Sequence, residues 1–321
     1  MGYMTNFSVI IPIGRPDEAG RSIRSVLDQK TSREFEVLLV GDVEIEVADS
    51  RVRSIVVADR NPAHRRNLAA REAVGEILAF LDDDAYARPD WLESAAAVFE
   101  SRPEVLAAGG PDPAPPDSTI SELFSDTLLA TPVIGSSVAA HESRRGVWNV
   151  EKPHDVALVN LFVRKRDFDL AGGFDESIGY IGEDSALLRV LLGKGLVLYS
   201  EHIIVEHRRR PFPGPYLKQR FRYRRKSGRL LLQRGVGRGE PKVYALLIAG
   251  VAFPLLLLFA PSMAGIALAL YFALTLKLSW RSSRRLPPPL RLLVPFAFLA
   301  HHATYFVGLA LGIVEGLARR R

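Results

Sequence analysis

The chain has 321 residues, enough for one large domain with an appendage or for two domains. It contains no cysteine, which excludes a disulfide scaffold, thiolate zinc sites and a cysteine nucleophile. The net charge is +6, and both the basic and the apolar residues are concentrated in the C-terminal third. The two ends of the chain therefore face different surroundings.

The first hundred residues alternate short apolar runs with amphipathic stretches. We expect strands at 7–12, 35–40, 52–57 and 76–81, and helices at 17–30, 61–74 and 90–100. This alternation is typical of an α/β layered fold with a mostly parallel sheet.

A proline-rich loop at 109–116 separates this half from a second one. There we expect strands at 155–164 and 196–205, a turn at 172–176 and a helix at 183–192. Residues 117–155 give no residue-level prediction.

A basic segment at 206–242 follows, with 13 Lys or Arg and 2 Glu, and its charge exceeds that of the whole chain. The next 34 residues, 243–276, carry no charge. One straight helix of that length would be about 50 Å long, against a hydrocarbon core of about 30 Å. Because proline and glycine interrupt the run, we expect two helices, at about 243–260 and 262–280.

A third uncharged run of 23 residues, 292–314, comes after a basic, proline-rich loop. The basic flanks and the lack of a polar face favour membrane helices over buried core helices of a soluble protein. Three spans would place Arg319-Arg-Arg on the far side, against the positive-inside tendency, and the third run contains His301 and His302. Two spans with an interfacial third helix and three spans both remain open.

Three carboxylates, Asp82, Asp83 and Asp84, come directly after an apolar strand. This position is the carboxyl edge of the sheet, where ligands bind in open α/β folds. Clustered carboxylates repel one another, and Mg²⁺ or Mn²⁺ with substrate phosphates is their usual partner. The alternative is a solvated acidic loop that caps the next helix.

A second pair, Glu183 and Asp184, begins an expected helix. The positive end of a helix favours ionised carboxylates. An ionised carboxylate beside a bound donor can act as general base for a hydroxyl nucleophile. The alternative is a helix N-cap.

The basic segment contains Gln219-Arg-Phe-Arg-Tyr223. Arginine and aromatic side chains at this spacing can hold a diphosphate or stack on a sugar. They can equally form a basic belt attracted to anionic lipid head groups. His207, at the end of a strand, has no assignment on its own.

In this order, the motifs resemble those of family 2 glycosyltransferases. They are the strand at 7–12, Asp42 after the second strand, Asp82–Asp84, Gly172-Gly-Phe-Asp-Glu176, Glu183-Asp184 and Gln219-x-x-Arg-Tyr223. The resemblance covers about residues 6–228 and implies a GT-A fold, which is Rossmann-like with a mostly parallel central sheet. The apolar tail is similar to that of the exopolysaccharide or lipid-linked glycan subgroup.

The resemblance also implies roles for single residues. Asp184 matches the catalytic base, with Glu183 beside it. Asp84 matches the metal ligand, together with Asp82 and, as in some members, His207. The residues implied in donor binding are Pro12, Asp42, Arg66 (in an Arg66-Asn67 pair), Asp82, Asp83, Gln219, Arg222 and Tyr223. The implied cofactor is a divalent metal, Mn²⁺ or Mg²⁺.

Three segments depart from the family pattern. Ile13-Gly-Arg-Pro16 stands for Thr-Tyr-Asn-Arg, and Gly41-Asp-Val-Glu44 stands for Asp-Asp-Gly-Ser. Both surround the nucleotide pocket, so donor identity is not predicted. Tyr223 replaces a tryptophan, which argues against processive polymerisation.

We therefore expect an inverting, metal-dependent glycosyltransferase. It would move a sugar from a nucleotide-sugar donor to a lipid-linked or glycan acceptor at the cytoplasmic membrane face. One alternative is a polyprenyl-phosphate sugar synthase, whose phosphate acceptor needs no general base. Another is a catalytically degenerate GT-A domain that acts as a membrane scaffold. A nucleic-acid binder is disfavoured, because the adjacent apolar run explains the basic segment.

The expected organisation is a GT-A domain at 1–228, a basic juxtamembrane linker at 229–242 and a membrane domain of two to three helices at 243–321. The expected location is the cell membrane, multi-pass, with the catalytic domain in the cytoplasm, since no signal-peptide pattern precedes the first strand. The expected partners are the donor, the acceptor and membrane lipids, with no nucleic acid. The sequence predicts neither the linkage nor the oligomeric state.

Overall fold

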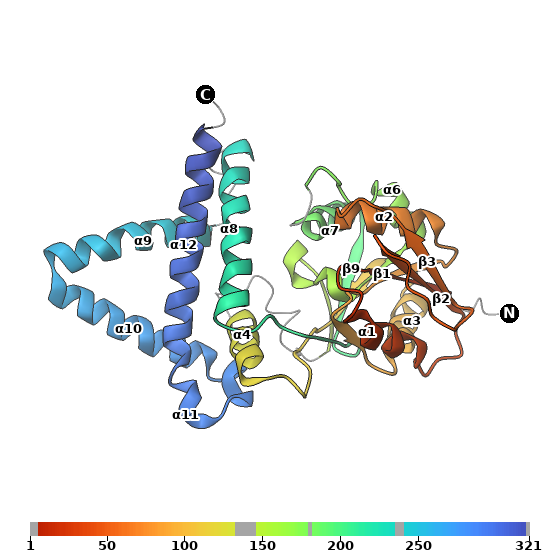
Figure 1. The fold of residues 1–321 in the computed structure, drawn as a ribbon, viewed down its shortest axis with the longest axis horizontal. Helices are drawn as coiled ribbons and strands as arrows, with labels where there is room; N and C mark the ends of the chain where they lie inside the picture. The colour runs from red at the N-terminus through yellow and green to blue at the C-terminus, as the bar shows by residue number, and fades with distance from the viewer. Residues whose placement is uncertain (1–5, 132–145, 179–181, 235–240, 319–321) are drawn as a thin grey trace. The chain divides into compact units, whose positions relative to one another are not determined.

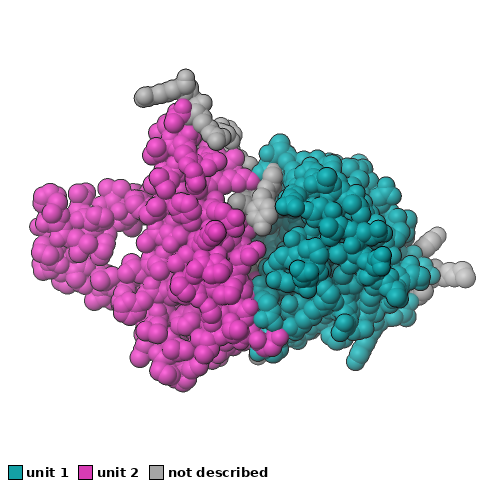
Figure 2. Space-filling view, viewed as in Figure 1, with its two compact units in different colours: residues 1–116, 136–208 teal, residues 117–135, 209–321 magenta. Residues whose placement is uncertain are grey.

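The computed structural model describes residues 6–131, 146–178, 182–234 and 241–318. The chain forms two compact units, one of residues 1–116 and 136–208 and the other of residues 117–135 and 209–321 (Figure 2). In this division the basic segment after Arg208 groups with the C-terminal helices, and the expected domain boundaries at 228 and 242 stay a prediction.

The first unit is built on an eight-stranded sheet with the order β3-β2-β1-β4-β8-β6-β9-β7 (Figure 1). Its strands are β1 (Phe7–Pro12), β2 (Phe35–Gly41), β3 (Val52–Val56), β4 (Ile77–Phe80), β6 (Val105–Gly109), β7 (Val147–Asn149), β8 (Leu161–Arg164) and β9 (Leu196–Ser200). Strands β3, β2, β1 and β4 pair in parallel, as do β6 and β9. Only β8 and β7 run antiparallel to their neighbours. The expected α/β fold with a mostly parallel sheet is confirmed.

Helices cover both faces of this sheet. Val9 and Ile11 of β1 pack in the same core as α1 (Ala19–Leu27) and α3 (Trp91–Ser101). Ile10 points to the other core, which α2 (Pro62–Glu72), α6 (Lys165–Leu170) and α7 (Glu183–Lys194) cover. Because both faces of the central strands are covered, β1 and β4 are buried and mainly apolar.

Two expected strands are wrong in extent. Residues 153–160 form two short 3₁₀ turns, and only Leu161–Arg164 is a strand. The buried side chain of Asn160 donates to the carbonyls of Pro111 and Ile203 and accepts from the indole N–H of Trp91, which ends the sheet here. A pattern of apolar residues does not predict such hydrogen bonds from a buried side chain.

The expected strand at 196–205 is two strands. After β9 the chain turns, and β10 (Val205–His207) pairs antiparallel with β5 (Ala85–Ala87) in a separate two-stranded sheet. In this pairing His207 lies opposite Ala85, one residue after the aspartate cluster.

The second unit is helical. Its elements are α4 (Ile120–Ala130), α8 (Gly214–Arg234), α9 (Pro241–Phe259), α10 (Pro261–Ser279), a 3₁₀ turn (Ser282–Arg285), α11 (Pro288–Arg291) and α12 (Val294–Ala318). Much of the basic segment is thus helix α8, including the first residues of the expected linker.

Helices α8 and α12 lie side by side (Figure 1). A Cβ atom at Gly312 would lie 2.0 Å from the carbonyl oxygen of Arg225, so only glycine permits this approach. Arg229 pairs with Glu315 at 2.7 Å, which places a charge pair at the end of the apolar helix.

By length and composition, two helical stretches of the described residues are able to cross a membrane, 261–279 and 288–318. The described part of α9, Tyr244–Phe259, is apolar but shorter. Only 17% of the apolar window in 261–279 is buried, which is unlike a helix in a soluble core. Large apolar side chains such as Met263, Ile266 and Leu270 are exposed on it.

Candidate functional site

The loop after β4 carries the aspartate cluster, and Asp83 ties it to the loop after β1. The backbone N–H groups of Gly14 and Arg15 both donate to Asp83 Oδ2 at 2.7 Å. Asp83 is 5% exposed, so its carboxylate is taken up by this contact. These contacts assign Asp83 a positioning role in the structure; its expected role in donor binding stays a prediction.

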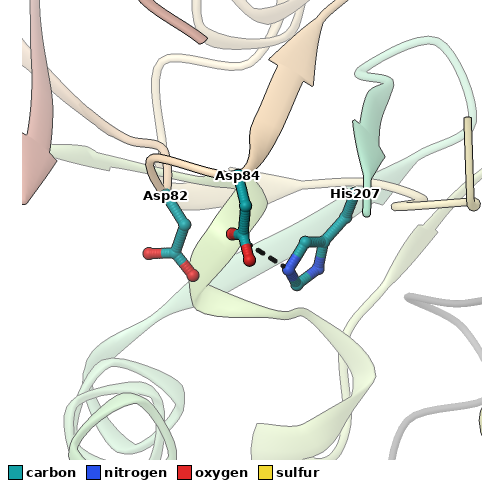
Figure 3. A group of neighbouring side chains, drawn as sticks. All are labelled: Asp82, Asp84 and His207. Carbon is teal, nitrogen blue, oxygen red and sulfur yellow. Dashed lines mark ion pairs between the residues drawn. The ribbon is translucent and has the colours of Figure 1, made fainter. Parts of the chain in front are cut away.

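Asp82 and Asp84 flank Asp83 and share a cluster with His207 (Figure 3). One potential ligand atom from each of the three lies within 4.8 Å of the others. Asp84 Oδ1 is 3.4 Å from His207 Nε2. Pairing of β10 with β5 creates this proximity between residues more than a hundred positions apart. The three residues are those that the family resemblance implied as metal ligands.

The ring of His207 is oriented by Asp112, whose Oδ2 lies 3.2 Å from Nδ1. Asp112 is 1% exposed and comes from the proline-rich loop. If Nδ1 carries the proton and donates to Asp112, the lone pair of Nε2 faces Asp84. A carboxylate that holds the outer nitrogen is the usual support of a metal-binding histidine. Carboxylate oxygens and an imidazole nitrogen are ligands that suit Mn²⁺, so the donor set fits the implied cofactor.

Replacing Asp112 with Asn should lower Mn²⁺ affinity by about 10- to 100-fold, the range typical for such supporting carboxylates. The neutral amide holds the imidazole less firmly and makes it a weaker base. Titration of the purified full chain, with free Mn²⁺ followed by electron paramagnetic resonance, measures this affinity. Asp17→Asn removes an exposed aspartate and serves as the control. Equal affinities in both variants would exclude a supporting role for Asp112.

Arg66 joins the two acidic motifs. It lies on α2, which begins at Asn61, whose side chain accepts the N–H of Ala63. The Arg66 guanidinium contacts Asp82 Oδ1 at 2.7 Å and Glu183 Oε1 at 3.5 Å. Because Arg66 is buried, it compensates the negative charge of both carboxylates at once.

The neighbouring Asn67 holds the turn at 172–176. Its side chain accepts the N–H of Phe174 and donates to the carbonyl of Phe174 and to Glu176 Oε1. Gly173 has φ +70, and a Cβ there would lie 2.8 Å from Asn67 Oδ1, so this position requires glycine. The Arg66-Asn67 pair therefore connects α2 with three of the motifs found in the sequence.

Asp184 and Glu183 form the first turn of α7, where Asp184 Oδ1 accepts its neighbour's N–H at 2.6 Å. The sequence predicted that the helix end would favour their ionised forms. The structure corrects this expectation: burial raises the pKa of Asp184, against the opposing effects of the Ser185 N–H and of Arg66. Burial also raises the pKa of Glu183, again opposed by Arg66.

Asp42 follows β2 at the same edge of the sheet. Arg60 Nη2 lies 2.7 Å from its carboxylate. Hydrogen bonds from its own backbone N–H and from Arg60 lower the pKa of Asp42, so it is a permanent acceptor. Arg65 donates to the carbonyl of Ile13, directly after Pro12. Asp42 and Pro12 thus share one neighbourhood, and their contacts with a donor stay a prediction.

Gln219, Arg222 and Tyr223 lie on α8 in the second unit. Gln219 Nε2 donates to the hydroxyl of Tyr223 at 3.2 Å. Their expected part in donor binding stays a prediction, whereas the contacts above unite the other site residues within the first unit.

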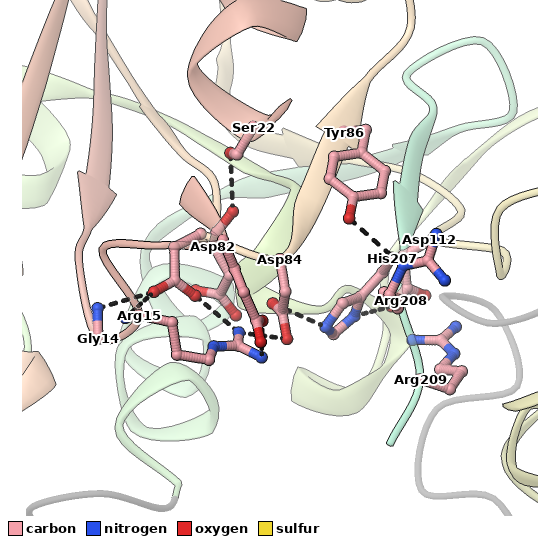
Figure 4. A network of polar contacts seen from close by, with 12 residues as sticks. Gly14, Arg15, Ser22, Asp82, Asp84, Tyr86, Asp112, His207, Arg208 and Arg209 are labelled. Carbon is pink, nitrogen blue, oxygen red and sulfur yellow. Dashed lines mark hydrogen bonds and ion pairs between the residues drawn. The ribbon is translucent and has the colours of Figure 1, made fainter. Parts of the chain in front are cut away.

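The sequence did not single out Arg15, which stands in the departure Ile13-Gly-Arg-Pro16. Its guanidinium contacts Asp83 at 2.7 Å and also pairs with Asp84 (Figure 4). Burial tends to raise the pKa of Asp84, but His207 and Arg15 outweigh it and hold that pKa well below its usual range. Asp84 is therefore an anion that lies between the Arg15 guanidinium and the His207 imidazole.

The sequence of the first unit resembles known proteins. Residues 8–165 match the family described as "Glycosyl transferase family 2". A glucosyl-dolichyl phosphate glucuronosyltransferase of Haloferax volcanii is 29% identical over 106 residues, 30% of this chain and 34% of that protein. An uncharacterised glycosyltransferase of Haemophilus influenzae is 31% identical over 105 residues, 30% of this chain and 36% of that protein. The match thus spans about a third of each of these curated relatives.

Among solved structures, a mannosyltransferase of Pyrobaculum calidifontis in complex with GDP-Man and Mn²⁺ superposes with a TM-score of 0.54 and 19% identity. The superposition covers 99% of this chain and 89% of that one. At this identity the likeness demonstrates a shared fold, which is of the GT-A type.

Proposed function

We propose that this chain, a transferase that carries a glycosyl transferase family 2 domain, moves a sugar from a nucleotide-sugar donor to a lipid-linked acceptor. The reaction would take place at the cytoplasmic face of the membrane and invert the anomeric carbon. The observation that carries the proposal is the placement of two acidic motifs, at 82–84 and 183–184, around one arginine, Arg66. One motif provides ligands for a cation and the other a candidate base.

In this proposal Asp82, Asp84 and His207 hold a divalent ion, and Asp112 keeps Nε2 of His207 directed at it. When bound, Mn²⁺ or Mg²⁺ supplies positive charge that stabilises the departing diphosphate. The complex of the Pyrobaculum calidifontis enzyme with GDP-Man and Mn²⁺ supports this choice of donor class and cofactor.

Asp184 is the proposed general base. It would take the proton of the acceptor hydroxyl as that oxygen attacks the anomeric carbon, while the bond to the diphosphate breaks. A single displacement of this kind inverts the anomeric configuration. Arg66 would hold Glu183 and Asp82 in place during the reaction through its two ion pairs, and Asp42 would accept a hydrogen bond from the nucleobase.

The raised pKa of Asp184 predicts the pH dependence of transfer. A base works only when deprotonated, so activity is present above the pKa of Asp184 and falls as the pH drops through it. Because this pKa is raised, the acidic limb should lie above the ordinary aspartate value of about 3.9. A profile of kcat/KM against pH at saturating Mn²⁺ measures the limb. Rates that stay constant down to pH 4 would show that transfer depends on no carboxylate with a raised pKa, which contradicts this prediction.

The second unit supports a membrane location. Apolar side chains are exposed along 261–279, and the basic helix α8 precedes the apolar helices in the chain. Exposed apolar faces next to basic residues suit insertion into a bilayer with anionic lipid at the cytoplasmic surface. The name of the Haloferax volcanii relative contains a dolichyl phosphate, which supports a lipid-linked acceptor here.

A transfer assay tests the proposal. The detergent-purified full chain is incubated with Mn²⁺, a panel of radiolabelled nucleotide-sugars and polyprenyl-linked saccharide acceptors, and lipid products are separated from unused donor. We expect label in the lipid fraction with one donor class, and its loss with EDTA. Label that enters lipid equally well in EDTA would contradict the metal-dependent mechanism.

A further inference from the structure

We propose that Arg15 competes with the divalent ion for Asp84 and that it binds the phosphates of the donor once the ion has replaced it. This inference rests on the proposed function and adds a coupling to it. Ion and donor would then bind cooperatively: each would raise the affinity of the protein for the other, and the Arg15 side chain would couple the two.

The first observation is that both oxygens of the Asp84 carboxylate face a basic side chain. Its Oδ1 faces Nε2 of His207 at 3.4 Å, and its Oδ2 pairs with the guanidinium of Arg15. His207 can share Asp84 with a divalent ion as a second ligand, whereas the Arg15 guanidinium occupies Oδ2 and must give way to the ion. An ion held by Asp82, Asp84 and His207 would bring two positive charges next to that guanidinium, and charges this close repel strongly at low effective dielectric.

The second observation is that the Arg15 side chain is partly exposed while its backbone is fixed. The N–H groups of Gly14 and Arg15 are bound by Asp83 at 2.7 Å, which anchors the loop. The Arg15 side chain itself is 32% exposed, against 7% for Asp83 and 14% for Asp84. Its other ion-pair partners are Asp83 at 2.7 Å and Glu18 at 3.2 Å, so the guanidinium keeps partners when it leaves Asp84. The guanidinium can thus leave Asp84 without unfolding the loop.

The third observation concerns chemistry. Arg15 follows Ile13 at the carboxyl edge of the sheet, beside the acidic cluster (Figure 4). A planar guanidinium released there is suited to bidentate contacts with phosphate oxygens. A diphosphate that coordinates the ion would then lie within its reach. Arg15 would weaken the binding of the ion alone and strengthen the binding of ion and nucleotide together.

The test measures Mn²⁺ binding to the purified full chain by electron paramagnetic resonance, alone and with saturating GDP or UDP. For Arg15→Gln we expect Mn²⁺ alone to bind about tenfold more tightly than in the wild type, because a repelling charge is lost. We also expect a smaller gain in Mn²⁺ affinity on adding the nucleotide, and weaker nucleotide binding by about tenfold. Arg15→Lys keeps the charge and should show the wild-type behaviour for Mn²⁺ alone.

Arg24→Gln is the matched control. Arg24 is an exposed arginine of α1, so this substitution removes the same charge from the same part of the chain. Thermal unfolding in EDTA shows whether each variant is folded. If Arg15→Gln binds Mn²⁺ no more tightly than the wild type and Arg24→Gln do, then Arg15 does not compete with the ion. Arg15 would then only support Asp84. Absence of Mn²⁺ and nucleotide binding in the folded wild type would instead overturn the proposed function, and this inference with it.

Discussion

Replacing Asp184 with Asn should lower the rate of sugar transfer by about 10²- to 10⁴-fold and leave donor binding unchanged. The substitution keeps the size and the acceptor oxygen of the side chain but removes its ability to take a proton. Asp184 lies in the first turn of α7, whereas Arg66 forms its ion pairs with Glu183 and Asp82. The metal cluster should therefore stay intact. Single-turnover transfer and nucleotide titration measure the two quantities separately.

The control for this variant is Asp169→Asn, which changes an exposed aspartate of α6. Transfer by Asp184→Asn within about threefold of the wild type would remove the base assignment. That outcome would favour a polyprenyl-phosphate sugar synthase, because an ionised phosphate acceptor needs no general base.

Replacing Asp84 with Asn should abolish Mn²⁺-dependent donor binding and lower transfer by about 10³-fold or more, since metal charge stabilisation is worth several kcal/mol. Asp84 is the residue at which His207, Arg15 and the proposed ion meet. The amide keeps a neutral oxygen but loses the charge that attracts a cation. Calorimetric titration of the variant with Mn²⁺ and nucleotide measures the loss.

Loss of folding is the competing explanation for an inactive Asp84 variant. Arg15 retains Asp83 as a partner and His207 retains Asp112, so the variant should unfold near the wild-type temperature in EDTA. Asp17→Asn, an exposed aspartate outside the cluster, is the control. A folded Asp84→Asn variant that binds Mn²⁺ as tightly as the wild type would show that the ion is held elsewhere.

Much of the fold could be predicted because its causes are local. The strand at 7–12 is mainly apolar because both sheet faces are covered, and α2 begins where Asn61 and Pro62 signal a helix start. The motif at 82–84 could be placed at the sheet edge from the strand before it. The order of the motifs along the chain gave the family resemblance, and this resemblance predicted that Asp184 and His207 belong to the same site.

What could not be predicted depends on contacts between distant segments. Asp112 acquires its role only because β10 brings His207 beside the proline-rich loop. Arg15 acquires its role because the loop after β1 meets the loop after β4. The direction of the Asp184 pKa was misjudged because a helix end acts locally, whereas burial depends on the packing around the helix. Residues 132–145, within the segment that gave no prediction, lie outside the described residues.

The most direct test of the metal-dependent transferase is the thermal stability of the detergent-purified full chain with nucleoside diphosphates and their sugars, with and without Mn²⁺. A ligand that binds only the folded state raises its stability by mass action, by about 2.7 kcal/mol at a hundredfold excess over Kd. We expect one nucleotide class to raise the unfolding temperature, and only when Mn²⁺ is present. A well-folded protein that responds to no nucleotide, with or without Mn²⁺, would contradict the account and favour a GT-A domain that serves as a membrane scaffold.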